Sequence, residues 1–229
     1  ENDPWLGDWN AHHLFVADDE DAWVGNFGDT SNVVYNAFMA DPWSGQRIYL
    51  DDWTDEQARA AALSAFNQGS LLVSYFGHSS WHQWASETLL HVSDVSDLHN
   101  GAQLPVVLSM TCYTGFFQHP EYGTLDESLL RHERGGAVAT WSPSGLGLNT
   151  GHQHLHYGFY QSVLDDGQVQ LGMATTAAKA YLYAQAPAQV DLLYTFHLFG
   201  DPAMALNLTI QPWPHSIYLP SVSQQYSGG

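Results

Sequence analysis

At residues 71–78 the sequence reads Leu-Leu-Val-Ser-Tyr-Phe-Gly-His, and at residues 104–112 it reads Leu-Pro-Val-Val-Leu-Ser-Met-Thr-Cys. Both runs are short, rich in β-branched and aromatic residues and bounded by turn formers, which is typical of strands buried on both faces of a parallel sheet. Parallel strands end at the same edge of a sheet, where open α/β folds bind their ligands. The sequence therefore predicts that His78 and Cys112 emerge side by side at this edge.

Strand and helix patterns alternate on both sides of these two runs. Apolar strand patterns occur at 13–17, 47–50 and 137–141, and helical patterns occur near 33–39, 54–66, 124–134, 154–164 and 172–186. Residues 196–202 predict a turn before a last strand near 203–210. This alternation indicates an α/β fold with a mainly parallel sheet and helices on both faces.

The length of 229 residues and the hydrophobic content of 45% are enough for one large domain. Residues 1–12, with Pro4 and Gly7, show no clear periodicity and are expected to form a leading segment. Residues 13–210 are expected to form a catalytic α/β domain. Residues 211–229 contain three prolines and end in Ser-Gly-Gly, so they are expected to form a linker-like tail.

The chain is strongly acidic, with five Lys and Arg residues against 24 Asp and Glu residues and a formal charge of −19. This charge repels phosphate backbones and anionic membranes, so nucleic acid is not an expected partner. The sequence has neither an apolar run long enough to span a membrane nor a retained signal peptide. A single cysteine excludes an internal disulfide, and the acidic, lysine-poor, Trp-rich composition favours an extracellular or cell-surface protein. Nothing in the sequence indicates an oligomeric state.

Cys112 is the sole cysteine of the chain. A cysteine acts as a nucleophile in its thiolate form, and a histidine within hydrogen-bond reach can generate that anion. His78 at the neighbouring strand end suits this role, with Cys112 attacking a carbonyl and His78 protonating the leaving amine before water releases the thioester. The competing interpretation is a buried, inert thiol, which is the commoner fate of a lone cysteine.

Acidic residues follow the first predicted strand, at Asp18, Asp19, Glu20 and Asp21, and Asp29 follows shortly afterwards. One of these carboxylates is expected to orient His78 or to bind a basic group of a substrate. The competing interpretation is a solvated acidic turn that caps the next helix.

Aromatic and polar residues near the same edge are candidates for the substrate pocket. Trp81, Trp84 and Glu87 lie on the loop after His78, Trp141 ends the strand at 137–141, and Ser142 begins the loop that follows it. Tryptophans on a loop beside a base suggest a pocket wall. They could equally close the edge of the hydrophobic core.

The ordered succession of these motifs resembles the gingipain family of cysteine peptidases, over roughly residues 13–207. The resemblance is carried by Gly77-His78-Ser79-Ser80, by Cys112 with Gly115 and Phe117, by Leu125-Asp126-Glu127-Ser128-Leu129-Leu130, by Gly136-Ala137-Val138-Ala139, by Ser142-Pro143 and by Phe199-Gly200-Asp201-Pro202. It implies a caspase-like α/β fold, a catalytic pair at His78 and Cys112, and a protein or peptide as substrate.

The chain departs from the family at Ser79, where the family commonly has the second glycine of Gly-His-Gly. The resemblance implies an oxyanion hole made by the backbone N–H groups of Ser79 and Cys112. If this position requires a positive φ, Ser79 carries strain. The acid that supports the histidine is expected to be Asp29, with Asp21 as the second choice.

Gingipains cleave after basic residues, and the acidic loop at 18–21 would attract Arg or Lys. The loop at 142–149 instead carries Gly145, Leu146, Gly147 and Leu148 without an acid, which would suit a small or apolar side chain. Specificity for Arg or Lys is the expectation that follows from the resemblance.

Two other functions remain open at this point. His152, His154 and His156 could belong to a metal-dependent hydrolase, although no H-E-x-x-H motif occurs and a third ligand is not specified. A catalytically inactive gingipain-like surface binding module is the second, and Ser79 favours it. No cofactor is expected to be required, although calcium could stabilise the acidic loops.

Overall fold

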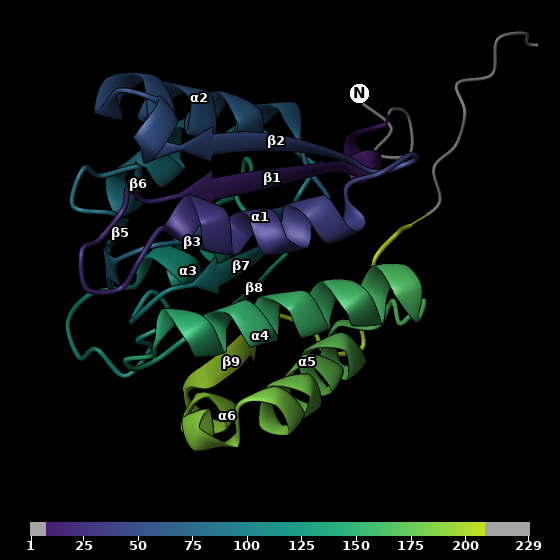
Figure 1. Cartoon of the computed structure of the whole chain (residues 1–229). Coiled ribbons are helices and arrows are strands. Elements are labelled where there is room, and N and C mark those ends of the chain that lie inside the picture. The colour runs from purple at the N-terminus through teal and green to yellow at the C-terminus, as the bar shows by residue number, and fades with distance from the viewer. Residues whose placement is uncertain (1–7, 209–229) are drawn as a thin grey trace, which may run out of the picture.

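The computed structural model describes residues 8–208. A six-stranded sheet with the strand order β2-β1-β3-β7-β8-β9 forms its centre (Figure 1). Strands β2, β1, β3, β7 and β8 pair in parallel, and β9 is antiparallel to β8. The mainly parallel α/β fold predicted from the sequence is confirmed. Residues 1–7 and 209–229 lie outside the described residues, and the predicted boundary at 210 falls among them. The predicted division of the chain at 12 and 210 stays a prediction.

The strands are β1 (His12–Ala17), β2 (Ser44–Tyr49), β3 (Leu72–Phe76), β7 (Val106–Met110), β8 (Ala139–Pro143) and β9 (Phe196–Phe199), with a small antiparallel sheet of β4 (Ser79–Ser80), β5 (Gln83–Trp84) and β6 (Leu90–His91). The helices are α1 (Phe27–Phe38), α2 (Asp55–Gln68), α3 (Leu125–Arg131), α4 (Asn149–Tyr160), α5 (Leu171–Gln185) and α6 (Leu192–Thr195), and a π-helical turn at Gln161–Asp165 extends α4. No helix within residues 8–208 is long and apolar enough to cross a membrane.

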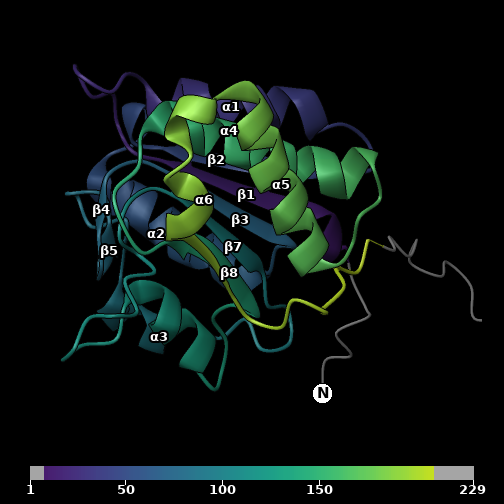
Figure 2. The same ribbon diagram turned by 90° about the horizontal axis from the view of Figure 1, so that it is seen from below.

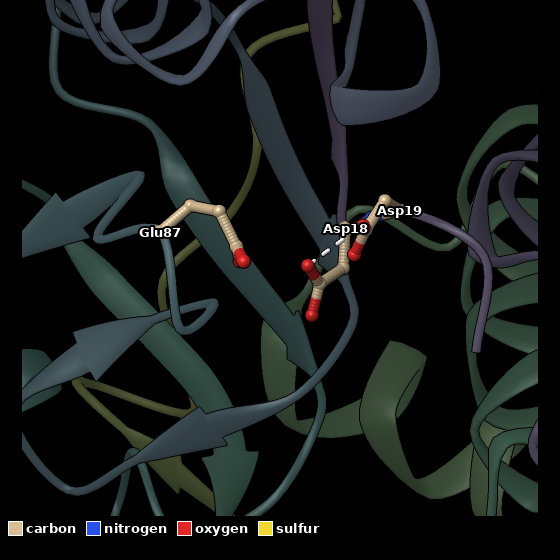
Figure 3. A group of neighbouring side chains, drawn as sticks. All are labelled: Asp18, Asp19 and Glu87. Atoms are coloured by element: carbon tan, nitrogen blue, oxygen red, sulfur yellow. Dashed lines mark hydrogen bonds between the residues drawn. The ribbon is translucent and has the colours of Figure 1, made fainter.

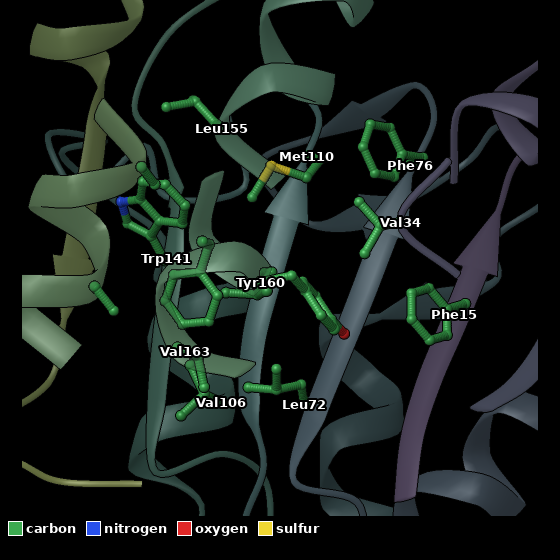
Figure 4. Close-up of a cluster of buried hydrophobic side chains, with 14 of the residues drawn as sticks. Phe15, Val34, Leu72, Phe76, Val106, Met110, Trp141, Leu155, Tyr160 and Val163 are labelled. Carbon is green, nitrogen blue, oxygen red and sulfur yellow. The ribbon is translucent and has the colours of Figure 1, made fainter. Parts of the chain in front are cut away.

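Strand β3 illustrates why its sequence is a continuous apolar run. Leu72 and Phe76 point into the hydrophobic cluster covered by α1, α4 and α5, whereas Val73 and Tyr75 point into the cluster covered by α2 and α3. Figure 2 shows α1, α4 and α5 on one side of the sheet and α3 on the other. Figure 4 shows the first cluster, where side chains of the strands meet those of the helices. Each large apolar side chain buried in this way contributes roughly 1.5–3 kcal/mol.

Two helices begin with the caps that their sequences encode. The side chain of Thr54 accepts a hydrogen bond from the backbone N–H of Gln57, and the side chain of Gln57 accepts one from the backbone N–H of Thr54, so α2 starts with a capping box. Thr124 and Glu127 form the same arrangement at the start of α3. Reciprocal caps satisfy two otherwise unpaired N–H groups and fix where each helix starts.

The prediction of a last strand near 203–210 was wrong. Among the described residues the last strand is β9, which lies earlier in the chain, at Phe196–Phe199. This strand pairs antiparallel with β8 at the edge of the sheet. The chain leaves it at Gly200, where a Cβ atom would lie 2.8 Å from the Cβ of Ala139. A half-buried edge strand of four residues lacks the length and apolar continuity by which the central strands are recognised.

Candidate active site

Strands β3 and β7 pair in parallel, and their last matched residues are Phe76 and Met110. His78 and Cys112 each follow two residues later. The hydroxyl of Thr111 donates a hydrogen bond of 2.6 Å to the carbonyl oxygen of Gly77, which ties the two strand ends together beyond the sheet. The chain therefore delivers the histidine and the cysteine from neighbouring strand ends at the same level.

The backbone of His78 is held by two buried side chains. The carboxylate of Asp18 accepts the N–H of His78 at 2.8 Å, and the hydroxyl of Tyr75 donates to its carbonyl oxygen at 2.6 Å. Gly77 makes this approach feasible, because a Cβ atom there would lie 2.3 Å from the Tyr75 hydroxyl oxygen and 2.4 Å from the Asp18 Cβ. Burial raises the pKa of Asp18 to about 6, against the hydrogen bond from His78 that lowers it.

The ring of His78 lies at the surface between an acid and an aromatic ring. Its Nε2 atom is 3.3 Å from an Oδ2 atom of Asp21, and the edge of the Phe27 ring packs against it with centroids 5.1 Å apart. Asp21 also accepts the N–H groups of Trp23 and Val24, which lower its pKa most, so the carboxylate stays ionised. An ionised carboxylate at this nitrogen accepts its N–H and fixes the orientation of the ring.

The acid in contact with His78 is thus Asp21, the second choice of the sequence analysis. Asp29, the first choice, is exposed in the first turn of α1, where its backbone N–H bonds to the side chain of Asn26 at 2.7 Å. The role of Asp29 in catalysis stays a prediction. The spacing of residues in the sequence does not show which of the two acids reaches His78. The side chain of Asp21 is directed by its turn, in which it accepts the N–H groups of Trp23 and Val24.

Cys112 is half-buried, and its Sγ atom lies 3.7 Å from the carbonyl oxygen of Gly147. Burial raises the pKa of this thiol, and the contact with Gly147 lowers it by less. Burial therefore disfavours the thiolate, which is the form in which a cysteine is nucleophilic. The next residue, Tyr113, has a φ of 60° and donates its N–H to Gly145 at 3.1 Å. A non-glycine residue in this region costs about 1–3 kcal/mol and is typical of active sites.

Ser79 lies in the extended strand β4, where it is paired with Trp84 of β5. The strain that a positive φ would have caused does not arise. Its hydroxyl instead contacts Cys112, because Ser79 Oγ accepts the backbone N–H of Cys112 at 3.2 Å and donates to the carbonyl oxygen of the same residue. No pattern in the sequence predicts this contact, because the two residues are 33 positions apart.

Three of the five predicted pocket residues do not line an open pocket. The side chains of Trp84, Trp141 and Ser142 are fully buried, each with 0% exposure. Trp84 stacks on Tyr75 with ring centroids 4.6 Å apart, and Trp141 packs among core aromatic rings. A large indole gains more from burial in an apolar layer than from exposure at a loop, which corrects the prediction of a tryptophan wall.

Trp81 remains at the surface within an aromatic cluster. Its ring stacks on His119 at 5.0 Å and on Tyr122 at 5.6 Å, and His82 lies beside it at 4.5 Å. The cluster joins the loop after His78 to the loop after Cys112, so the structure brings Trp81 to the same edge as the predicted pair.

Glu87 lies with Asp18 and Asp19 in a group of carboxylates whose ligand atoms are within 4.8 Å of one another. Figure 3 shows Glu87 reaching toward the two aspartates from across the site. Hard cations such as calcium prefer carboxylate oxygens, so these three residues could hold one.

Two histidines of α4 pack inside the core and are not grouped as metal ligands would be. His152 and His156 are buried in the core, where burial lowers the pKa of each to about 3. His156 bonds through Nε2 to the hydroxyl of Ser74 at 2.8 Å. Their packing gives these histidines a structural role in the core, which weighs against the metal-dependent alternative.

The geometry can be compared with known proteins. The model of peptidase family C25 matches residues 1–207. The crystal structure of the Arg-specific cysteine proteinase gingipain R (RGPB) is 20% identical, with a TM-score of 0.77, and the match covers 88% of this chain and 49% of that one. The complex of the RgpB pro- and mature domains from Porphyromonas gingivalis gives 19% identity, a TM-score of 0.77, and coverages of 88% and 50%.

A third structure, named only as a protease, gives 14% identity, a TM-score of 0.73, and coverages of 86% and 48%. The chain therefore spans about half the length of the solved structures that it matches. A comparison with curated proteins gives no match. Because the family model covers nearly the whole described chain and the fold agrees, this chain belongs to peptidase family C25, the gingipain family.

Proposed function

We propose that this chain is a cysteine endopeptidase in which Cys112 is the nucleophile and His78 the general acid and base. The observation that carries the proposal is the register of β3 and β7, which ends two residues before each of these side chains. The contact of His78 with Asp21 adds a group that holds the histidine ring. Membership of a cysteine peptidase family supports the same chemistry.

In the first step His78 takes the proton of the Cys112 thiol, and the sulfur bonds to the carbonyl carbon of the peptide. The π electrons move to the carbonyl oxygen, which becomes an oxyanion. The oxyanion then reforms the carbonyl group while the C–N bond breaks, and His78 gives its proton to the leaving amine. Water, deprotonated by His78, attacks the thioester, the C–S bond breaks, and the thiol is regenerated.

The proposed preference is for Arg or Lys before the cleaved bond, as in the Arg-specific gingipain R. The carboxylates of Asp19 and Glu87, near Asp18 and the His78 backbone, support this choice because they would attract a cationic side chain. Leu146 and Leu148, 65% and 68% exposed, flank the carbonyl group that contacts Cys112. These leucines favour the competing preference for an apolar side chain.

The proposed substrate is a protein or peptide outside the cytoplasm. The net charge of −19 and the single cysteine support a secreted or cell-surface location. Immunoblotting of the culture medium and of the cell fractions, with an antibody against this chain, tests the location.

The test compares wild-type protein with Cys112→Ala and His78→Ala on matched peptides that carry Arg, Lys, Leu, Asn or Asp before the cleaved bond. We expect each variant to lose at least roughly 10²-fold in kcat/KM, the lower range of general acid–base catalysis. The melting temperature should change little, because both side chains lie at the edge of the sheet. Ser80→Ala is the control, since Ser80 is the next serine of β4 and its hydroxyl contacts His82.

Iodoacetamide should inactivate the wild type by modifying one residue, Cys112. Faster cleavage after Leu than after Arg would assign the specificity to the loop with Leu146 and Leu148. Binding of peptides without any cleavage would support the inactive binding module, and activity that survives Cys112→Ala would refute the proposed nucleophile.

A further inference from the structure

The backbone N–H of Cys112 is already hydrogen-bonded within the chain. Its acceptor is the hydroxyl oxygen of Ser79, 3.2 Å away. In a thiol peptidase the N–H of the nucleophilic cysteine is suited to stabilise the oxyanion, because it points to where the negative charge develops. The Ser79 side chain therefore occupies a donor that the proposed reaction needs.

The hydrogen of the Ser79 hydroxyl also takes part in a hydrogen bond with Cys112. Ser79 donates to the carbonyl oxygen of Cys112, so the serine forms a two-point clasp with one residue. The hydroxyl of Thr111 lies 2.6 Å from both Ser79 Oγ and the carbonyl oxygen of Gly77 and donates its hydrogen toward these two acceptors, which completes a small network between the ends of β3 and β7. With its hydrogen turned to a carbonyl group, Ser79 presents lone pairs to the site of the oxyanion.

From this geometry we propose that Ser79 is an intrinsic brake on the peptidase, whose hydroxyl competes with the substrate oxyanion for the Cys112 N–H. The inference rests on the proposed function and adds a restraint on the same site. Before the tetrahedral intermediate forms, the Ser79 hydroxyl must leave the N–H, and the enzyme loses one hydrogen bond at that step. Serine has one side-chain torsion to turn, so the brake can be released without a change of the backbone.

Removing the hydroxyl should therefore accelerate the reaction. Ser79→Gly and Ser79→Ala are expected to raise kcat/KM by roughly 2- to 12-fold, the factor that corresponds to one neutral hydrogen bond. Ala suits this position because strand β4 is extended. The neighbouring control Ser80→Ala should stay near the wild-type value, because the hydroxyl of Ser80 contacts His82.

Two inhibitors separate the brake from a general change in the thiol. A peptide aldehyde forms a hemithioacetal whose oxygen occupies the oxyanion site, so its affinity should rise with kcat/KM in Ser79→Gly. Iodoacetamide alkylates the sulfur without forming an oxyanion, and its rate should be unchanged. Equal acceleration of both reagents would show a change in thiol reactivity and would overturn the proposal.

The hydrogen bond itself can be followed without any hydrolysis. Cys112 is the sole cysteine, so labelling with ¹⁵N-cysteine gives one backbone amide resonance. We expect this amide to exchange its hydrogen faster in Ser79→Ala than in the wild type, and at the wild-type rate in Ser80→Ala. Unchanged exchange in Ser79→Ala would refute the hydrogen bond on which the inference rests.

The activity data complete the distinction. A fall of kcat/KM in both Ser79→Gly and Ser79→Ala would show that the hydroxyl assists the reaction, which also overturns the brake. If no variant and no wild-type protein hydrolysed any peptide, the proposed function would fail as a separate matter, and the brake would have no reaction to restrain.

Discussion

Three buried histidines should make the stability of this protein fall steeply in mild acid. His13, His152 and His156 are 1%, 3% and 0% exposed. Burial is the largest cause that lowers the pKa of each from 6.5 to about 3. Their rings are therefore neutral in the folded protein throughout the range in which an exposed histidine becomes charged.

The sign of the effect follows from the proton balance. Below pH 6.5 the unfolded chain binds protons at these three sites and the folded protein does not, so the free energy of unfolding decreases as the pH falls toward about 3. Between pH 7 and pH 5 each histidine with this shift removes about 2 kcal/mol. The three together remove about 6 kcal/mol.

Two buried carboxylates act in the opposite direction. Burial raises the pKa of Asp18 and of Asp126 from 3.8 to about 6. The folded protein therefore takes up protons at these sites first, and the stability they contribute is lost as the pH rises through about 6. From pH 7 to pH 5 they return about 3 kcal/mol in total, which leaves a net loss of about 3 kcal/mol. Such a loss is a large share of the 5–15 kcal/mol typical of folded domains.

Urea unfolding at pH 7 and pH 5, followed by tryptophan fluorescence, measures this difference. His13→Gln and His156→Gln should each reduce the loss between the two pH values by about 2 kcal/mol, because glutamine does not titrate. His99→Gln is the control, since His99 is exposed, and it should keep the full loss. Equal stability at the two pH values, or an undiminished loss in both glutamine variants of the buried histidines, would refute the reasoning.

Two further predictions concern the acids around His78. Asp21→Asn should lower kcat by less than the roughly 10²-fold minimum for losing the general base, because asparagine keeps a polar contact with the ring but loses the charge; a larger loss in Asp29→Asn would return the orienting role to Asp29. Hydrolysis should survive a zinc-selective chelator, and calcium should raise the melting temperature of the wild type but not of Glu87→Gln; activity lost to the chelator and restored by zinc alone would contradict this.

The parts of the site that could be predicted from the sequence are those fixed by strand ends. The two apolar runs lead to His78 and Cys112, and their pairing follows from the rule that parallel strands share an edge. The burial of Trp84 could not be predicted in this way. The nearby residues His82, Gln83 and Ser86 are polar, and Trp84 reaches the core because β4, β5 and β6 fold back over Tyr75. Pairing between two-residue strands leaves no periodic pattern in the sequence.

The side chains that form hydrogen bonds to the loops of His78 and Cys112 could not be predicted from the sequence either. Beyond a strand end the backbone loses its ladder partners, so its polar groups must be satisfied by side chains. Asp18 does this for the loop of His78 by accepting the backbone N–H of His78, and it also accepts the N–H of its own neighbour Asp19. In a sequence, Asp18 is one of four consecutive acids and resembles a solvated turn.

Asp126 is the buried acid that contacts the loop of Cys112. It is fully buried in the first turn of α3, and the hydroxyls of Ser142, Thr114 and Ser109 oppose the rise of its pKa. Its N–H also bonds to the carbonyl oxygen of Thr114, two residues after Cys112. His78 and Cys112 thus each lie in a loop that is hydrogen-bonded to a residue with a buried carboxylate, Asp18 and Asp126 respectively. Because burial raises the pKa of both carboxylates to about 6, they take up protons in the same pH range in which the buried histidines destabilise the core, and this uptake offsets part of that loss.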